Sequence, residues 1–145
     1  MGTATAKDAA RAAGCALGQI VKTIVTVCDG KPVVALVPGD RRVDLAKVAR
    51  AAGATEARIA KAAEVEEATG FTPGGVAPFP LPSVERVLID HNLLGHDVVW
   101  IAAGSPVHVA AIDPGVLMRL ARAQPLDAVE EASNYDSGSI SRGDA

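Results

Sequence analysis

The stretch "IVKTIVTVCDGKPVVALV", residues 20–37, decides the fold. It contains two runs rich in β-branched residues, 20–28 and 31–37, separated by an Asp-Gly pair. An Asp-Gly pair between two such runs is a strong signal for a two-residue β-hairpin, because both residue types tolerate the positive φ angles that the turn needs. We therefore predict two antiparallel strands, with Pro32 near a strand start, where proline is tolerated.

Lys22 interrupts the first of these strands. Side chains alternate between the two faces of a strand, so Lys22 shares a largely apolar face with Ile20, Ile24 and Cys28. Burial lowers the pKa of a lysine, and the three donors of its ammonium can bind a carbonyl or phosphate oxygen. The alternative is a lysine whose ammonium reaches water from a strand end. The strand pattern leaves both interpretations open.

Beyond the hairpin, short helical patterns alternate with short strand patterns. Apolar spacing and capping residues predict helices at residues 3–13, 43–53, 62–70 and 113–125. Further strands are predicted at residues 57–60, 83–90, 97–104 and 106–112. Because the strands are joined both by a hairpin and by helices, we predict an α+β fold. We expect a mixed, largely antiparallel twisted sheet flanked by short helices.

The composition indicates one domain with a polar tail. The chain has 145 residues, of which 49% are hydrophobic, enough to build a real core. We assign residues 1–126 to a single domain and expect residues 127–145, which are small and polar, to be disordered. The formal net charge is −3, but bases outnumber acids between Asp40 and Lys61. Such a local excess is typical either of a phosphate-binding surface or of a solvated helix face.

Several classes of function are disfavoured. Trp100 and Tyr135 are the single residues of their kinds, which argues against a platform of stacked aromatic rings for nucleic acid. Cys15 and Cys28 match no metal or redox spacing, and free thiols suit a reducing cytoplasm. No apolar run approaches membrane-spanning length, and the start of the chain lacks the apolar core of a signal peptide. We therefore expect a cytoplasmic protein without a membrane partner.

The loop "GFTPGG", residues 70–75, is a candidate binding element. Gly70 suits the left-handed conformation at a helix end, and Pro73 stiffens the loop. Gly74 and Gly75 let another group approach the main chain, whose N–H groups can bind an anion or a developing oxyanion. An ordinary Pro-Gly turn is the alternative. His108 shares a strand face with small apolar residues, which is more typical of a core histidine than of a catalyst.

Taken in order, these segments resemble the YbaK/ProX family of aminoacyl-tRNA editing domains. The matching segments are "VKT" at 21–23, the Asp-Gly hairpin, "EEATGFTPGGVAPFP" at 66–80 and "AAGSPVHVAAIDP" at 102–114. Members of this family are freestanding relatives of the insertion domain in bacterial prolyl-tRNA synthetases. The lysine of the first long strand and the G-x-x-P-G loop are the most specific signals, and they are strong together. The resemblance extends from Thr5 to Leu126.

The resemblance implies hydrolysis of the ester that joins a wrong amino acid to a tRNA, here tRNA(Pro) carrying alanine, cysteine or serine. Lys22 takes the family's catalytic position, where it contacts the aminoacyl group or the terminal phosphate. The implied substrate-binding residues are Thr23, Gly70, Thr72, Pro73, Gly74, Gly75, Ser105 and His108. The family is understood to use the terminal ribose hydroxyl of the tRNA to activate water, so no cofactor and no metal are expected. The aminoacyl-tRNA 3′ end is the expected partner, and an aminoacyl-tRNA synthetase and a second copy of the chain are further candidates.

Two alternatives to the deacylase remain open. A non-catalytic module would use the same residues to bind the aminoacyl end or to dock on a synthetase. A small-molecule binding protein would pair Lys22 with a carboxylate. Replacing Lys22 with alanine separates the deacylase from the module, because a module should show no ester hydrolysis even before the substitution.

Overall fold

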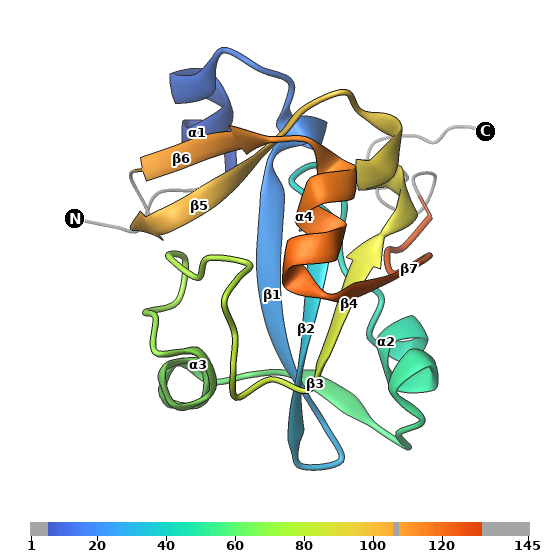
Figure 1. Ribbon diagram of the computed structural model, residues 1–145. Coiled ribbons are helices and arrows are strands. Elements are labelled where there is room, and N and C mark those ends of the chain that lie inside the picture. Colours follow the sequence, from blue (N-terminus) through green and yellow to red (C-terminus); the bar gives the residue numbers. More distant parts are fainter. Residues whose placement is uncertain (1–5, 106–107, 132–145) are drawn as a thin grey trace, which may run out of the picture.

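The computed structural model describes residues 6–105 and 108–131, without the side chains of residues 103–105 (Figure 1). Its strands are β1 (Val21–Cys28), β2 (Lys31–Pro38), β3 (Ala57–Ile59), β4 (Arg86–Asp90), β5 (Val99–Ser105), β6 (His108–Ile112) and β7 (Ala123–Leu126). Its α-helices are α1 (Ala6–Ala13), α2 (Leu45–Ala52), α3 (Ala62–Thr69) and α4 (Pro114–Ala121), and short 3-10 helices occupy Leu17–Gln19 and His91–Gly95. Among the described residues, no helix has the length and hydropathy needed to cross a membrane.

The predicted hairpin is confirmed. β1 and β2 pair antiparallel along their whole length, and Cys28 and Lys31 close the ladder. Asp29 and Gly30 form the turn with φ angles of 49° and 87°. The Asp29 carboxylate also accepts hydrogen bonds from the main chain just before β3, at Thr55 N (2.9 Å) and Glu56 N (3.1 Å). The turn is therefore fixed both by its own residues and by a distant segment.

The predicted α+β class with a mixed sheet is also confirmed. The main sheet has the order β3-β1-β2-β4-β7. β1 runs antiparallel to β2 and β3, whereas β4 runs parallel to β2 and β7. β5 and β6 form a separate antiparallel ribbon, which meets β1 at one bridge between Ile20 and Trp100. Figure 1 shows this ribbon lying across one end of β1.

One helix prediction was too long. The helix at residues 113–125 begins as predicted, since the Asp113 side chain accepts from Gly115 N (2.8 Å) and Val116 N (3.1 Å). It ends at Ala121, because Arg122 takes a left-handed conformation with φ 54°. The next residues form β7, which pairs with β4 at the edge of the sheet. Pro125 is tolerated in β7 because an edge strand leaves one side unpaired.

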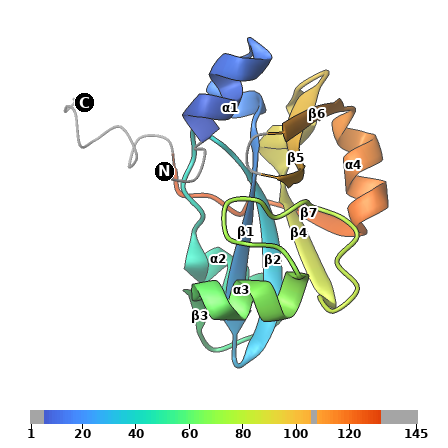
Figure 2. The same cartoon turned by 90° about the vertical axis from the view of Figure 1, so that its left-hand side faces the viewer.

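Two apolar clusters lie on opposite faces of the sheet. One contains Val21, Val25 and Leu36 and extends to Val76 and to Leu117 of α4. The other lies under α2, and its members are Cys28, Val33, Ala35, Val37, Val48, Leu88, Ala128 and Val129. Figure 2 shows α2 and α4 on opposite sides of the strands. The alternation read from the sequence therefore assigns each strand residue to one of two cores.

The predicted tail does not separate from the domain at Asp127. Ala128 and Val129 have exposed fractions of 0% and 1%, and Val129 bridges to Val43. Two small apolar residues among polar ones gave no sequence signal of this packing. Residues 127–131 thus pack with the domain, and the remainder of the predicted tail lies outside the described residues.

Candidate active site

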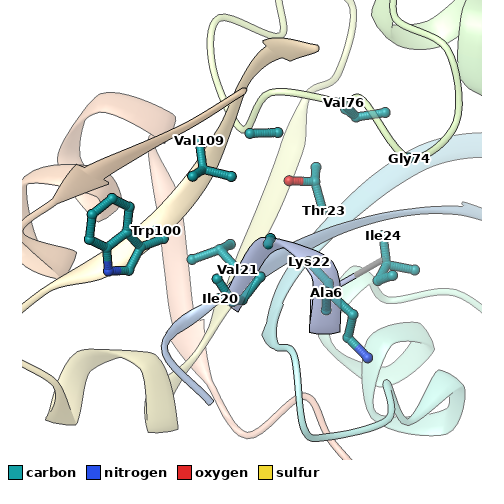
Figure 3. A pocket seen from close by; sticks show the side chains of 12 residues that line it. Ala6, Ile20, Val21, Lys22, Thr23, Ile24, Gly74, Val76, Trp100 and Val109 are labelled. Carbon is teal, nitrogen blue, oxygen red and sulfur yellow. The ribbon is translucent and has the colours of Figure 1, made fainter. Parts of the chain in front are cut away.

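A hollow of about 250 Å³ lies beside the free edge of β1. It is bounded by α1, the β5–β6 ribbon and the loop that follows α3 (Figure 3). The residues that line it are Ala6, Ala9, Ile20, Val21, Lys22, Thr23, Ile24, Gly74, Val76, Trp100, Ala102 and Val109. Most are apolar, and the two with polar side chains are Lys22 and Thr23. A cavity with these properties can hold a small apolar group and orient a few polar atoms.

The main chain of β1 turns polar groups toward this hollow. In an antiparallel ladder, alternate residues direct their N–H and C=O groups to the same neighbour. The Ile20 carbonyl accepts from Gly39 N at 2.8 Å on the β2 side, whereas the Val25 carbonyl accepts from Ala60 N at 2.9 Å on the β3 side. Thr23, two residues before Val25, therefore directs its N–H and C=O groups to the outer edge.

Neighbouring strands leave this edge uncovered at Thr23. β3 pairs with β1 from Thr26 to Cys28, and β5 meets it at the Ile20–Trp100 bridge. Among the strands of the described ranges, none pairs with the outer edge at Thr23. Main-chain polar groups that are removed from water need a hydrogen-bond partner. The free edge therefore offers one donor and one acceptor to whatever fills the hollow.

Lys22 lines the hollow with its ammonium turned away from the loop. Figure 3 shows its side chain running from β1 away from Val76, whereas Thr23 points toward the space between Val76 and Val109. Nζ donates to the Arg41 carbonyl at 2.6 Å. Burial lowers the pKa of the Lys22 ammonium, and the nearby Asp40 partly opposes this effect. Lys22 and Gly74 lie on different sides of β1, but the same hollow reaches both.

The glycine-proline loop contributes one lining residue. Gly70 ends α3 in the predicted left-handed conformation, with φ 79°, and donates to Glu66 O at 2.8 Å. The Gly75 N–H donates to Thr72 O at 3.0 Å, so the turn itself uses this donor. Gly74, with φ 84°, is the residue that faces the hollow.

Other predicted binding residues stand away from the lining. Thr72 and Pro73 are exposed and shape the loop. His108 is exposed at the start of β6, and its neighbour Val109 lines the hollow instead. This follows from strand alternation, which turns adjacent side chains to opposite faces. The side chain of Ser105 lies outside the described residues.

Sequence reasoning missed the apolar wall of the hollow. Trp100 and Ala102 of β5 face it, while the alternating residues Val99 and Ile101 are buried in the first cluster. Because side chains alternate along a strand, the sequence could have predicted that residues 100 and 102 share one face. Val76 comes from a loop and had no such signal.

The described residues contain one group with metal-ligand chemistry, and none of its members lines the hollow. Potential ligand atoms of Asp90, His91 and Asp127 lie within 4.8 Å of one another. Asp90 is fully buried, and its oxygens accept from Ala128 N (2.8 Å), Asn92 N (3.1 Å) and Asn92 Nδ2 (2.9 Å). These bonds assign Asp90 a structural role.

The basic excess between Asp40 and Lys61 is partly structural as well. Arg41 donates to Glu130 O at 2.6 Å, and Lys47 pairs with Asp127 at 2.9 Å. Arg58 pairs with Glu64 at 2.7 Å. The remaining bases of this stretch, Arg42, Arg50 and Lys61, are exposed. Both interpretations, a phosphate-binding surface and a solvated helix face, therefore stay open for these three bases.

Comparison with known proteins points to one family. The model of the aminoacyl-tRNA editing domain matches residues 1–120. A proline–tRNA ligase of Nitratidesulfovibrio vulgaris (strain DP4) is 36% identical over 104 residues, which cover 72% of this chain and 18% of the ligase. A candidate Cys-tRNA(Pro)/Cys-tRNA(Cys) deacylase of Enterococcus faecalis, EbsC, is 27% identical over 121 residues, which cover 83% of this chain and 74% of that protein.

Solved structures agree with this comparison. The crystal structure of a candidate trans-editing enzyme for prolyl-tRNA synthetase superposes with a TM-score of 0.83 at 40% identity. It covers 89% of this chain and 82% of that one. The chain spans about a fifth of the length of the proline–tRNA ligases it matches.

Proposed function

Because the chain belongs to the aminoacyl-tRNA editing domain family, we propose that it hydrolyses the ester between an amino acid and the 3′ end of a tRNA. The observation that carries this proposal is the hollow that joins Lys22, the free edge of β1 at Thr23, and Gly74. We propose tRNA(Pro) carrying alanine, cysteine or serine as the substrate, since the relatives are named for prolyl-tRNA synthesis and for Cys-tRNA(Pro). We place the reaction in the cytoplasm, where tRNA is charged.

The lining of the hollow suits hydrolysis of an activated ester. An ester needs no strong protein nucleophile if a water is positioned and charge on the carbonyl oxygen is stabilised. The Thr23 N–H on the free edge is one donor for that oxygen, and the main chain at Gly74 approaches from the other wall. The Lys22 ammonium gives one of its three N–H donors to Arg41 O, so two remain for a substrate phosphate.

The same lining supports selection by size. Val76 and Val109 bound the part of the hollow into which Thr23 points, and Ala102 also lines the hollow. A synthetase cannot strongly reject a smaller amino acid, because the loss of one methylene lowers the binding free energy by only about 1–3 kcal/mol. A second site with narrow apolar walls can admit the small amino acid and exclude the correct one.

The test is a panel of mischarged tRNAs with ester loss followed over time. We expect hydrolysis of tRNA(Pro) carrying alanine, cysteine or serine, and a rate about 100-fold lower for Lys22→Ala, because that change removes a positioned charge. Lys31→Ala is the matched control, since Lys31 is an exposed lysine in the same hairpin. Circular dichroism should show that both variants stay folded.

A wild-type chain that hydrolyses no ester in this panel contradicts the deacylase. Binding of the charged tRNA end without hydrolysis would then indicate the non-catalytic module. That alternative has one observation in its favour, because the matched part of the proline–tRNA ligases is 18% of their length and works beside a larger body. A synthetase is therefore a proposed partner in either case.

A further inference from the structure

We propose that residues 127–130 form a strap that positions the Lys22 ammonium through Arg41. This inference rests on the deacylase function proposed above. It assigns a role to the segment that directly follows β7, more than a hundred residues after Lys22 in the sequence.

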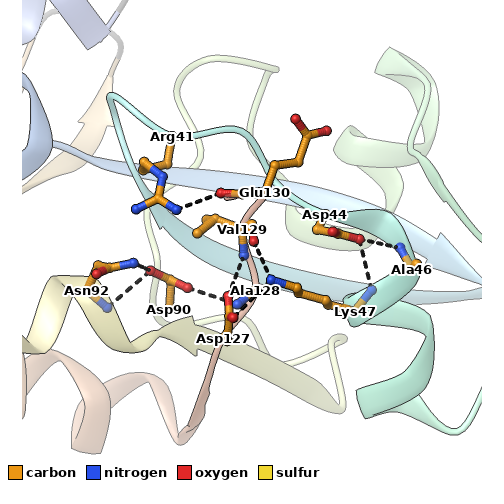
Figure 4. Close-up of polar contacts among 10 residues, drawn as sticks. All are labelled: Arg41, Asp44, Ala46, Lys47, Asp90, Asn92, Asp127, Ala128, Val129 and Glu130. Carbon is orange, nitrogen blue, oxygen red and sulfur yellow. Dashed lines mark hydrogen bonds and ion pairs between the residues drawn. The ribbon is translucent and has the colours of Figure 1, made fainter. Parts of the chain in front are cut away.

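The strap is anchored to the sheet by a buried carboxylate. Asp90, at the end of β4, has an exposed fraction of 0% and accepts from Ala128 N at 2.8 Å. Asn92 holds the other carboxylate oxygen through two hydrogen bonds, at 3.1 and 2.9 Å (Figure 4). Charge-assisted hydrogen bonds of this kind are stronger than neutral ones. Ala128 and Val129 add apolar packing under α2.

The strap is also bonded to the segment that leads into α2. Asp44 N donates to Ala128 O at 2.8 Å, and Glu130 N donates to Arg42 O at 2.8 Å. Lys47 Nζ donates to Val129 O at 2.7 Å. Figure 4 shows the Lys47 side chain in contact with the strap at Val129 O and at Asp127. Each of the two segments donates one main-chain hydrogen bond to the other and accepts one from it. The strap therefore holds residues 41–44 in place.

Arg41 links this arrangement to Lys22. Its guanidinium Nη2 donates to Glu130 O at 2.6 Å, and its own carbonyl accepts from Lys22 Nζ at 2.6 Å. The side chain of Arg41 thus holds the strap while its main chain holds the lysine. A lysine side chain has many rotamers, so fixing its ammonium before substrate arrives removes an entropic cost from the reaction. Arg41 is therefore a positioning residue, which acts through Lys22.

The first experiment compares Arg41→Met, Arg41→Lys and Arg119→Met in the full chain. Arg41→Met removes the contact with Glu130 O and also a buried Nε that has no hydrogen-bond partner in the structure, so the fold should tolerate it. We expect kcat for deacylation to fall about tenfold with KM little changed, since the loss falls on positioning in the transition state. Arg41→Lys should recover most of the rate, because its ammonium can reach the same carbonyl. Arg119→Met, which changes an exposed arginine of α4, should have no effect.

A double-substitution cycle tests whether Arg41 acts through Lys22. In a Lys22→Met background, Arg41→Met should lower the rate no further, because its target is already absent. An equal loss in both backgrounds would overturn the proposal and assign Arg41 a general structural role. An unchanged rate for Arg41→Met alone would also overturn it.

A spectroscopic measurement keeps this inference separate from the proposed function. The ¹⁵N NMR signal of the Lys22 ammonium, recorded without tRNA, should shift in Arg41→Met and stay in place in Arg119→Met. If the wild type hydrolyses no ester but this shift is seen, the proposed deacylase function is wrong, whereas the proposed positioning of Lys22 through Arg41 is supported. If the signal does not move, the strap does not position Lys22, whatever the activity.

Discussion

The two sides of β1 carry similar residues but differ in what covers them. On the side of Thr26 and Cys28, α2 and the strap cover the strand, and polar groups there find partners within the protein. Thr26 Oγ1, for example, donates to Val33 O at 2.7 Å. On the side of Val21 and Thr23, the neighbouring strands stop short and leave a hollow of about 250 Å³. Both faces of β1 therefore carry a core, and the space available for a ligand lies at the strand edge beside Thr23.

This comparison shows that the function depends on where pairing ends. The residues on the open side are mostly apolar. The outer edge of β1 nevertheless has no paired strand at Thr23 among the described strands. Lys22 belongs by alternation to the covered side, but it lies close enough to the open end of β1 to line the hollow. Substitutions on the covered side should therefore lower stability, and substitutions on the open side should lower activity.

The largest effect is expected from Leu88→Ala on the covered side. Leu88 is fully buried in the cluster under α2, so the change should lower the free energy of unfolding by about 2–5 kcal/mol. Leu120→Ala is the matched control, because Leu120 is 53% exposed and should cost less than about 0.5 kcal/mol. Urea denaturation measures both. Deacylation per folded molecule should not change, and a loss of activity without a loss of stability would contradict the comparison.

An intermediate effect is expected from Gly74→Ala on the open side. Gly74 has φ 84°, where a side chain costs about 1–2 kcal/mol, and the added methyl group enters the hollow. We expect deacylation to fall about tenfold. Gly53→Ala is the control, since Gly53 has φ 68° at the end of α2 and an added Cβ would meet nothing within 4 Å. It should lose similar stability and keep its activity, and equal activities for the two variants would contradict a role of Gly74 in the site.

The smallest effect is expected at the surface where α3 begins. The Arg58 guanidinium and the Lys61 main-chain N–H lower the pKa of Glu64 to about 2. The folded state therefore binds fewer protons than the unfolded state, and this contribution to stability is present at neutral pH and lost as the pH falls through about 2. Arg58→Met should raise the pKa of Glu64 while leaving it below 4.5, because the Lys61 bond remains. An NMR titration of Glu64 measures this, and an unchanged pKa would contradict the assignment to Arg58.

Local chemistry could be read from the sequence with good accuracy. The Asp-Gly hairpin, the Asp113 cap and the glycine ends of α2 and α3 all depend on a few adjacent residues, and all were confirmed. β7 was missed because its partner, β4, lies more than thirty residues earlier in the chain. The lining of the hollow was found only in part. Lys22, Thr23 and Gly74 came from motifs, whereas Val76, Trp100 and Val109 face the hollow because of how separate elements pack.

By itself, the sequence determined the turns, the caps and the face to which each strand residue belongs, because these follow from neighbouring residues and from the period of a strand. Tertiary structure alone decided which side of β1 would be covered. It also decided that Arg41, 89 residues from Glu130 in sequence, would join the strap to Lys22. Contacts over such separations are set by the packing of the whole sheet, and no local pattern encodes them.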